Sequence, residues 1–276
     1  MHSQRNPENT ILIACSMMED EINRVLQKYH LQYPVVWMER GYHSRPEKLR
    51  AVLQEQITLA EQRLHSTAGA QNGKPETGNP PFPKCYGGNE NPETKDHPAR
   101  AAHIAENPAG SPAVLLAYGL CGNGTEGLQA ESAVLAMPRF DDCINTLLCC
   151  GPRTSRALEQ AGVYYLTRGW TLDTGAMLQS HQKMLEKYGE KKTKIIMQMM
   201  YDGYKSVAVI DDGCYDTAPV QQYAQKCTDL LHVDTETVPG GTNILEKLLT
   251  GNWDDDILVK PAGKPVKQED FFYEKN

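Results

Sequence analysis

The chain has 276 residues, a formal net charge of −7, and 28 Lys and Arg residues that form no basic stripe with interleaved aromatic side chains. These properties argue against a nucleic-acid-binding surface, and the length is enough to bury a sizeable core. The N-terminus lacks a basic segment followed by an apolar one, and no run approaches the roughly 18 apolar residues of a membrane helix. We therefore expect a cytoplasmic protein with small-molecule or protein partners, and no nucleic-acid or membrane partner.

Short apolar runs alternate with helical patterns along the chain. The runs predicted as strands are Thr10–Ser16, Pro34–Met38, the apolar start of Ala113–Thr125, Ala133–Met137, Val163–Leu166, Ser206–Ile210, Leu231–Val238 and Ile257–Val259. The segments predicted as helices are Glu19–His30, Glu47–Leu64, Gly127–Glu131, Ile144–Cys149, Ala176–Tyr188, Lys192–Asp202, Pro219–Thr228 and Thr242–Gly251. This alternation predicts an α/β fold with a mostly parallel, Rossmann-like sheet.

The chain is expected to form two lobes, an N-terminal α/β lobe over 1–170 and a C-terminal α/β lobe over 171–276. A strand, a turn bearing a cysteine and a helix recur around Cys15, Cys121 and Cys214, which suggests pseudo-symmetric lobes. Residues 66–112 hold eight of the 17 prolines and few large apolar side chains, so we expect a flexible insertion there. A lid or a subunit contact is the alternative for this segment.

Four potential metal ligands each follow a predicted strand: Cys15, His43, Cys121 and Cys143. The carboxyl ends of parallel strands meet at one edge of a sheet, so these side chains are expected to lie together. Thiolate and imidazole ligands select zinc, and three thiolates also suit a 4Fe-4S cluster with one exchangeable iron. The alternative is packing, because free cysteines are among the most buried residues.

The remaining cysteines give no simple metal motif. The chain has eight cysteines and no CxxC pair, and a cytosolic protein of this length does not depend on a disulfide framework. Cys227 lies within a predicted helix, where packing is expected. Cys214 stays open, since its DDGCYD turn could supply ligands or cap the next helix.

The turn around Cys121 is rich in glycine, which lets the backbone turn sharply and approach a bound cofactor. Trp170 follows a glycine at another strand end and could wall an aromatic pocket or close the core. The residues predicted to bind a cofactor are Gly119, Gly122, Asn123, Gly124 and Trp170.

A charged turn precedes Cys143 and is predicted to act in catalysis. In this interpretation Arg139 clamps a carboxylate or phosphate, while Asp141 or Asp142 orients His43 or acts as a general base. The competing interpretation is an ion pair plus a helix N-cap.

The segments ILIACSMMEDEI, HSRPEKL, AYGLCGNGTEGL, PRFDDCINTLL and YYLTRGW cover most of 11–172 outside the insertion. In these segments the sequence resembles the bacterial and archaeal family known as domain of unknown function 1638. The resemblance supports the grouping of Cys15, His43, Cys121 and Cys143, and it implies a link to anaerobic one-carbon and corrinoid methyl metabolism. At the level of fold, the arrangement is similar to quinolinate synthase, in which separate α/β lobes each lend one cysteine to a cluster.

Two functions are consistent with this sequence. The first is a metal-dependent enzyme in which an iron-sulfur or zinc centre binds and polarises a small-molecule substrate, alone or as a homo-oligomer. The second is a non-catalytic accessory module that binds a corrinoid or a metal, or that works with a corrinoid protein partner. A third interpretation is an ordinary phosphate-binding α/β domain. The absence of a lysine from GLCGNGT argues against a nucleoside triphosphatase.

Overall fold

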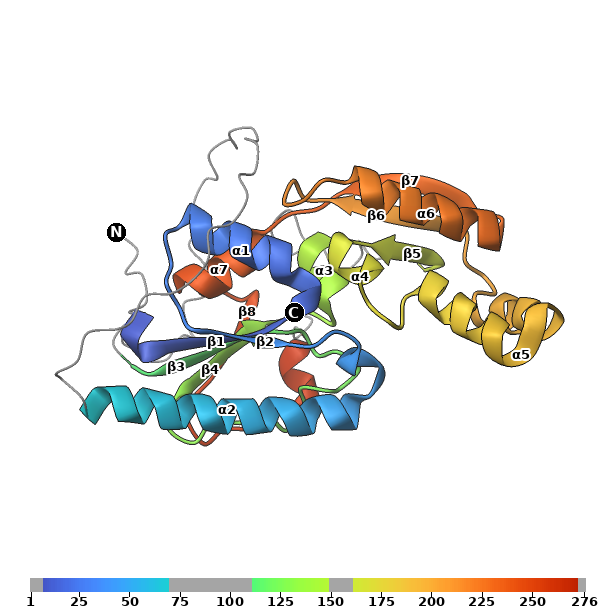
Figure 1. The fold of residues 1–276 in the computed structure, drawn as a ribbon. Helices are drawn as coiled ribbons and strands as arrows, with labels where there is room; N and C mark the ends of the chain where they lie inside the picture. The colour runs from blue at the N-terminus through green and yellow to red at the C-terminus, as the bar shows by residue number, and fades with distance from the viewer. Residues whose placement is uncertain (1–6, 70–110, 149–160, 273–276) are drawn as a thin grey trace.

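The computed structural model describes residues 7–69, 111–148 and 161–272 and forms two β-sheets. The first sheet has the strand order β2-β1-β3-β4-β8, and the second has the order β5-β6-β7 (Figure 1). The strands are β1 Thr10–Cys15, β2 Val35–Met38, β3 Ala113–Ala117, β4 Val134–Pro138, β5 Val163–Leu166, β6 Ser206–Asp211, β7 Asp234–Pro239 and β8 Ile257–Lys260.

Helices connect most of these strands. The α-helices are α1 Glu19–Lys28, α2 Pro46–Gly69, α3 Cys143–Leu148, α4 Arg168–Thr171, α5 Met177–Met200, α6 Ala218–Leu231 and α7 Asn243–Thr250. The short 3-10 helices are η1 Pro7–Asn9, η2 Ser16–Met18, η3 Tyr42–Ser44 and η5 Gln268–Phe271. No helix within 7–69, 111–148 and 161–272 combines the length and apolar character needed to cross a membrane.

Parallel pairing dominates both sheets, which confirms the predicted α/β class. Strands β2, β1, β3 and β4 are parallel neighbours, and only β8 runs antiparallel, against β4. The three strands of the second sheet are all parallel. The carboxyl ends of β2, β1, β3 and β4 therefore lie along one edge of the first sheet.

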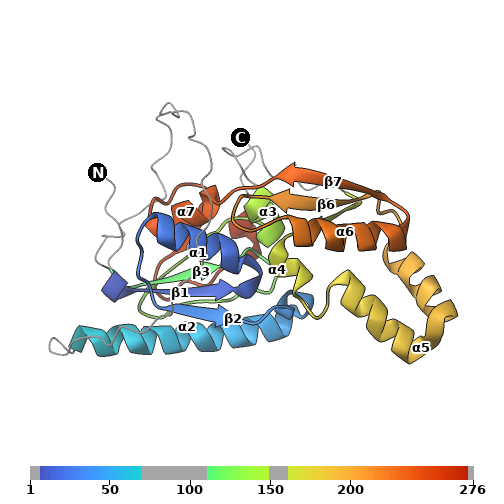
Figure 2. The same ribbon diagram turned by 45° about the horizontal axis from the view of Figure 1, so that its top comes forward.

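Helices cover both faces of the first sheet, with α1 and α7 on one face and α2 on the other (Figures 1 and 2). Ile13 and Leu116 pack into the α2 side of the core, whereas Leu12 and Leu115 pack toward α1 and α7. Successive strand residues point to opposite faces, so a strand buried on both faces must be apolar at every position. This explains the uninterrupted apolar runs of β1 and β3.

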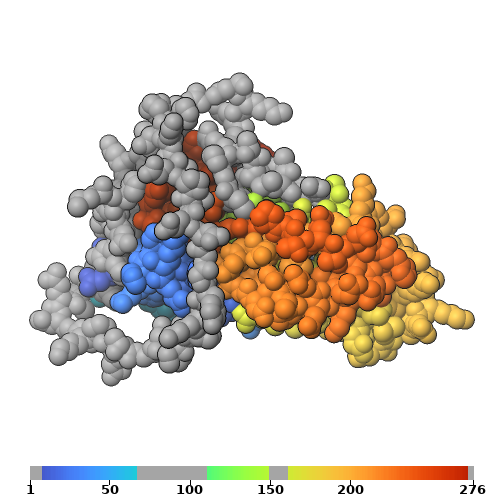
Figure 3. Space-filling view, turned by 90° about the horizontal axis from the view of Figure 1, so that it is seen from above, coloured from blue at the N-terminus to red at the C-terminus, as the bar shows by residue number. Residues whose placement is uncertain are grey.

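The second sheet packs against α6 and the long helix α5. Helix α5 combines the two predicted helices 176–188 and 192–202, and Gly189 separates them with a left-handed φ of 74°. Val207, Val209 and Ala224 form part of the core beneath. Viewed from above, α1 (blue) and the orange part of the second lobe lie on the same face of the molecule (Figure 3).

The sheets do not divide the chain at residue 170. Strand β5, over 163–166, belongs to the second sheet, and β8 returns the chain to the first sheet near its end. We call β1–β4, β8 and their helices the first lobe, and β5–β7 with α4–α6 the second lobe. The predicted N-terminal lobe 1–170 included β5, and the division of the chain into domains at residue 170 stays a prediction.

Two predicted elements differ from the structure. Residues Gly127–Glu131 form a turn and an irregular segment instead of a helix, since the backbone of 127 and 128 is hydrogen-bonded to Val266 near the C-terminus. Strand β7 starts at Asp234, because Leu231 is still the last residue of α6. The predicted insertion 66–112 lies outside the described residues over 70–110, and its first residues, up to Gly69, continue α2.

The two lobes lie very close together at Gly169. A Cβ atom at this position would lie 2.0 Å from the backbone oxygen of Met17 in η2. Beside it, Arg168 of α4 forms an ion pair with Asp20 of α1. Only a glycine allows the two backbones to approach this closely.

Replacing Gly169 with alanine should therefore force α4 away from η2. We expect Gly169→Ala to lower the free energy of unfolding by about 2 kcal/mol or more, because backbone atoms must move to relieve the clash. Urea denaturation of the variant and the wild type measures this change. Gly203→Ala is the control, since it meets nothing within 4 Å and carries only the strain of a φ of 84°. An equal loss in both variants would contradict the predicted contact.

Candidate functional site

The four predicted metal ligands line a single small cavity at the carboxyl edge of the first sheet. Cys15 ends β1, His43 lies in η3 after β2, Cys121 lies in the turn after β3, and Cys143 begins α3 after β4. The cavity has a volume of about 20 Å³. The rest of its lining is Met17, Met18, Glu39, Gly41, Tyr42, Ala117 and Tyr118.

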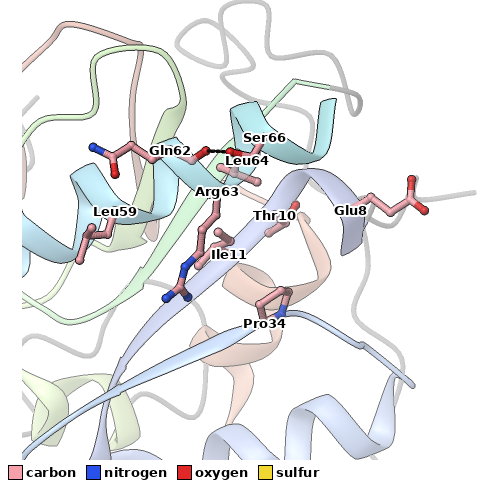
Figure 4. A pocket seen from close by; sticks show the side chains of 9 residues that line it. All are labelled: Glu8, Thr10, Ile11, Pro34, Leu59, Gln62, Arg63, Leu64 and Ser66. Atoms are coloured by element: carbon pink, nitrogen blue, oxygen red, sulfur yellow. Dashed lines mark hydrogen bonds between the residues drawn. The ribbon is translucent and has the colours of Figure 1, made fainter. Parts of the chain in front are cut away.

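Two larger cavities lie away from this edge. One, of about 560 Å³, is at the amino end of β1, where Thr10 and Ile11 face Leu59 and Arg63 of α2 (Figure 4). The other, of about 940 Å³, lies in the second lobe between α5 and the end of α6. In open α/β sheets ligands bind at the carboxyl ends of strands, which favours the small cavity as the functional site.

Cys121 occupies a strained backbone position at the centre of the site. Its φ is 48°, in the left-handed region that residues with a side chain rarely adopt. The turn is held by the loop after β4, since Cys121 N donates to Asp141 O at 2.7 Å and Leu120 N donates to Phe140 O at 2.8 Å. A Cβ atom on Gly119 would lie 2.5 Å from Phe140 O. Gly119 therefore allows the two loops to meet and present the thiol.

The other predicted cofactor-binding residues of this turn have local structural contacts. Gly122 and Asn123 have positive φ values of 60° and 68°, and Asn123 O accepts a hydrogen bond from Arg50 at 2.7 Å. A Cβ atom on Gly124 would lie 2.6 Å from Leu49 of α2. None of the three lines the cavity, so binding of a cofactor by them stays a prediction.

Burial suppresses ionisation of all three thiols. Removal from water raises the pKa of Cys15, Cys121 and Cys143 above the usual range of a cysteine. The neighbouring Asp142 and the other thiols raise the pKa of Cys121 and Cys143 further. The thiols are thus close enough to affect one another, and without a cation they are protonated at neutral pH.

Two buried hydrogen-bond donors face these thiols. Tyr118 Oη and Trp170 Nε1 are both buried and have no hydrogen-bond partner of normal geometry in the described part of the chain. Tyr118 nevertheless lies close to Cys15, and Trp170 lies close to Cys143. Each donor offsets part of the rise that burial causes in the pKa of its thiol. A buried donor without a partner is costly, and a thiolate would satisfy each of them. The two donors are therefore placed to stabilise negative charge on the sulfur atoms of Cys15 and Cys143.

His43 is held between the two lobes. Its ring centre lies 4.9 Å from that of Trp170, with the rings tilted by 54°. Burial lowers the pKa of His43, and the negative charges of Asp173 and Asp142 offset part of this effect. The imidazole is therefore neutral at pH 7, the form that can bind a metal or accept a proton. Trp170 also packs against the core of the second lobe, so its role as the wall of an aromatic pocket stays a prediction.

The residues of the charged turn after β4 have structural hydrogen bonds. Asp142 caps α3, since its Oδ1 accepts from Asn145 N at 2.8 Å, which matches the helix-cap interpretation. Asp141 is exposed, and Arg139 N donates to Asp256 O at 2.8 Å. None of Arg139, Asp141 and Asp142 lines the cavity, although the charge of Asp142 reaches its thiols. A catalytic role for these three residues stays a prediction.

Sequence reasoning missed three residues at this site. Arg40 follows β2, and its charge lowers the pKa of Cys15. Asp173 is buried and acts on both Cys15 and His43. Tyr118 could have been found, since it lies in the AYGLCGNG segment directly after β3. Arg40 could have been found in the same way, because it lies just after β2. Asp173 belongs to the second lobe, and no feature of the sequence indicated that it lies near the thiols.

The thiols line the cavity without forming a finished ligand set. In the described ranges, no three His, Cys, Asp or Glu side chains are already arranged to hold a metal ion. Binding of an ion would therefore require the cysteine side chains to turn inward. Rotation between staggered χ1 positions can supply such a movement.

The unpartnered hydroxyl of Tyr118 gives a test of this electrostatic arrangement. Tyr118→Phe should raise the pKa of Cys15, because it removes a donor that favours the thiolate. Alkylation of Cys15 by iodoacetamide at pH 8 should then slow by about tenfold, since a hydrogen bond to a charged group contributes about 1.5–3 kcal/mol. Mass spectrometry measures the rate. Tyr42→Phe, at another lining residue, should leave it unchanged, and equal slowing in both variants would contradict the assigned role.

Comparison with known proteins identifies the family of the chain. Residues 100–249, which are 150 of the 276, match the family described as "Protein of unknown function (DUF1638)". The match includes Cys121, Cys143 and Trp170 and begins after Cys15 and His43, whereas the resemblance seen in the sequence was placed over 11–172. Searches of the curated proteins and of the solved structures found no match. The chain belongs to the DUF1638 family.

Proposed function

We propose that the small cavity holds a metal centre whose protein ligands are Cys15, Cys121 and Cys143, with an open position toward His43. One observation carries the proposal. Three thiols from three adjacent strand ends line one cavity, and unpartnered donors face two of them. Residues that merely packed a core would not need buried donors beside their sulfur atoms.

The donor set and the cavity size favour a single thiophilic ion. Thiolates select zinc and iron-sulfur centres over hard cations such as magnesium. A volume of about 20 Å³ holds roughly one water-sized group, which suits one zinc ion. A 4Fe-4S cluster requires the cavity to widen. We therefore propose zinc as the first candidate for the metal and the 4Fe-4S cluster as the second.

The residues around the ion would have distinct tasks. Zinc supplies a Lewis acid when bound at an open position. Tyr118 and Trp170 would donate to the thiolates of Cys15 and Cys143 and so stabilise their charge. His43, which is neutral at pH 7, would accept a proton from a small-molecule substrate at the open position or fill that position itself. Trp170 would keep water from one side of the imidazole.

A non-catalytic metal-binding module is the second candidate, and the cavity volume favours it. After one ion is bound, a space of about 20 Å³ leaves no room for a substrate unless the cavity widens. A corrinoid ring is far larger than this space, so a corrinoid would have to be carried by a partner protein. The link to one-carbon metabolism depends on the family resemblance alone.

Replacing Cys121 with serine tests the metal site. We expect Cys121→Ser to lower metal affinity by more than about tenfold while the protein stays folded, because serine lacks the soft donor. Zinc, iron and sulfide are measured on protein purified without oxygen. Cys227→Ser is the matched control, since Cys227 is fully buried in the second-lobe core and should affect stability alone. Full metal content in the Cys121 variant would refute the proposed site.

Metal binding should also release protons. The raised pKa values mean that the thiols are protonated at neutral pH, and a metal binds only the thiolates. At pH 7 we expect roughly two to three protons per zinc ion, with an affinity that increases as the pH rises. Calorimetry in two buffers of different ionisation enthalpy gives the number of protons. Release of less than one proton would mean that the thiols are not the ligands.

A further inference from the structure

Outside the thiol cavity, the least explained polar groups are two carboxyls where the lobes meet. Glu21 lies on α1 of the first lobe and is 1% exposed. Both of its carboxyl oxygens are buried without a hydrogen-bond partner. Asp212 follows β6 of the second lobe, and its Oδ2 is buried without a partner as well. Burial of this kind is unfavourable for two ionised carboxylates.

The two carboxyls face each other closely enough for one to bond to the other. Ionised carboxylates only accept hydrogen bonds, so two of them in contact cannot satisfy one another. If one is protonated, it donates to the other and both become satisfied. The second oxygen of Asp212, Oδ1, already accepts from Cys214 N at 2.9 Å. The unpartnered oxygens therefore identify the position of a missing proton.

The surrounding charges do not replace this proton. On α1, Asp20 adds negative charge near Glu21 and is itself paired with Arg168. Arg24, on the same helix, acts on Cys214, and no cation is among the main influences on Glu21 or Asp212. The remaining groups that face the pair from the second lobe are Asp211, Cys214 and Tyr215.

We propose that Glu21 and Asp212 share one proton, and that this hydrogen bond is a pH-sensitive joint between the two lobes. Helix α1 follows Cys15 through η2, in which Met17 contacts Gly169. Trp170, the next residue, packs on His43. The shared proton therefore fixes the same interface that places Trp170 at the thiol cavity.

The sign of the pH dependence follows from burial. Removal from water raises the pKa of both carboxyls above their usual range, so the folded protein holds the proton more tightly than the unfolded chain. Stability from this joint is fully present at acidic pH and is lost as the pH rises through the raised pKa. Two buried negative charges then repel each other across the interface.

Thermal unfolding of the full chain tests this joint. Glu21→Gln supplies a permanent donor to Asp212, so its melting temperature should exceed that of the wild type by about 3 °C or more at pH 8.5. At pH 5.5 the difference should be smaller, because a larger fraction of the wild type then carries the proton. Asp212→Asn should behave in the same way. Glu47→Gln, at an exposed acid in the first turn of α2, is the control and should show no such dependence.

The same proton can be observed without substitution. In protein with ¹³C-labelled carboxyl groups, one Glu resonance should titrate well above the usual range of a glutamate and should be absent from Glu21→Gln. The joint is refuted if no carboxyl titrates above its usual range, or if Glu21→Gln changes the melting temperature equally at both pH values. It is also refuted if a chelator lowers the wild-type melting temperature at pH 8.5 but not that of Glu21→Gln, since the pair would then hold a cation.

Discussion

The parallel hydrogen-bonded pairing of β2, β1, β3 and β4 is the constraint on which the rest of the structure depends. It places the carboxyl ends of four strands along one edge of the sheet. The segments that follow these strands therefore lie beside one another at that edge. Cys15, His43, Cys121 and Cys143 are distant in sequence and lie together only for this reason. The close packing of the β3 and β4 loops at Gly119 then fixes the strained backbone of Cys121.

The thiol cavity combines two opposing electrostatic effects. Burial removes the thiols from water and makes their ionisation unfavourable, while Tyr118 and Trp170 favour the ionised form. Such a balance is useful where a cation supplies the remaining stabilisation, since the thiolates then form only when the cation is present. Without a cation the thiols stay protonated, which also protects them from oxidation.

The second lobe completes the site instead of forming a separate one. It supplies Trp170, which packs on His43, and Asp173, whose charge reaches both His43 and Cys15. Its contact with the first lobe depends on close backbone approach at Gly169 and on the buried pair of Glu21 and Asp212. The geometry of the thiol cavity thus depends on how the two lobes sit against each other.

The α/β class, most of the strands and the edge at which the thiols lie together could be predicted from the amino-acid sequence. Those features depend on local apolar patterns, which report burial on one or two faces of an element. The folded structure was needed to show that β5 joins the second sheet and that β8 returns to the first, because strand pairing is non-local. The folded structure also shows which polar groups are buried away from water. Tyr118 lies in an apolar run, and Glu21 looks like an ordinary acid in the first turn of a helix, until the fold buries each beside its partner.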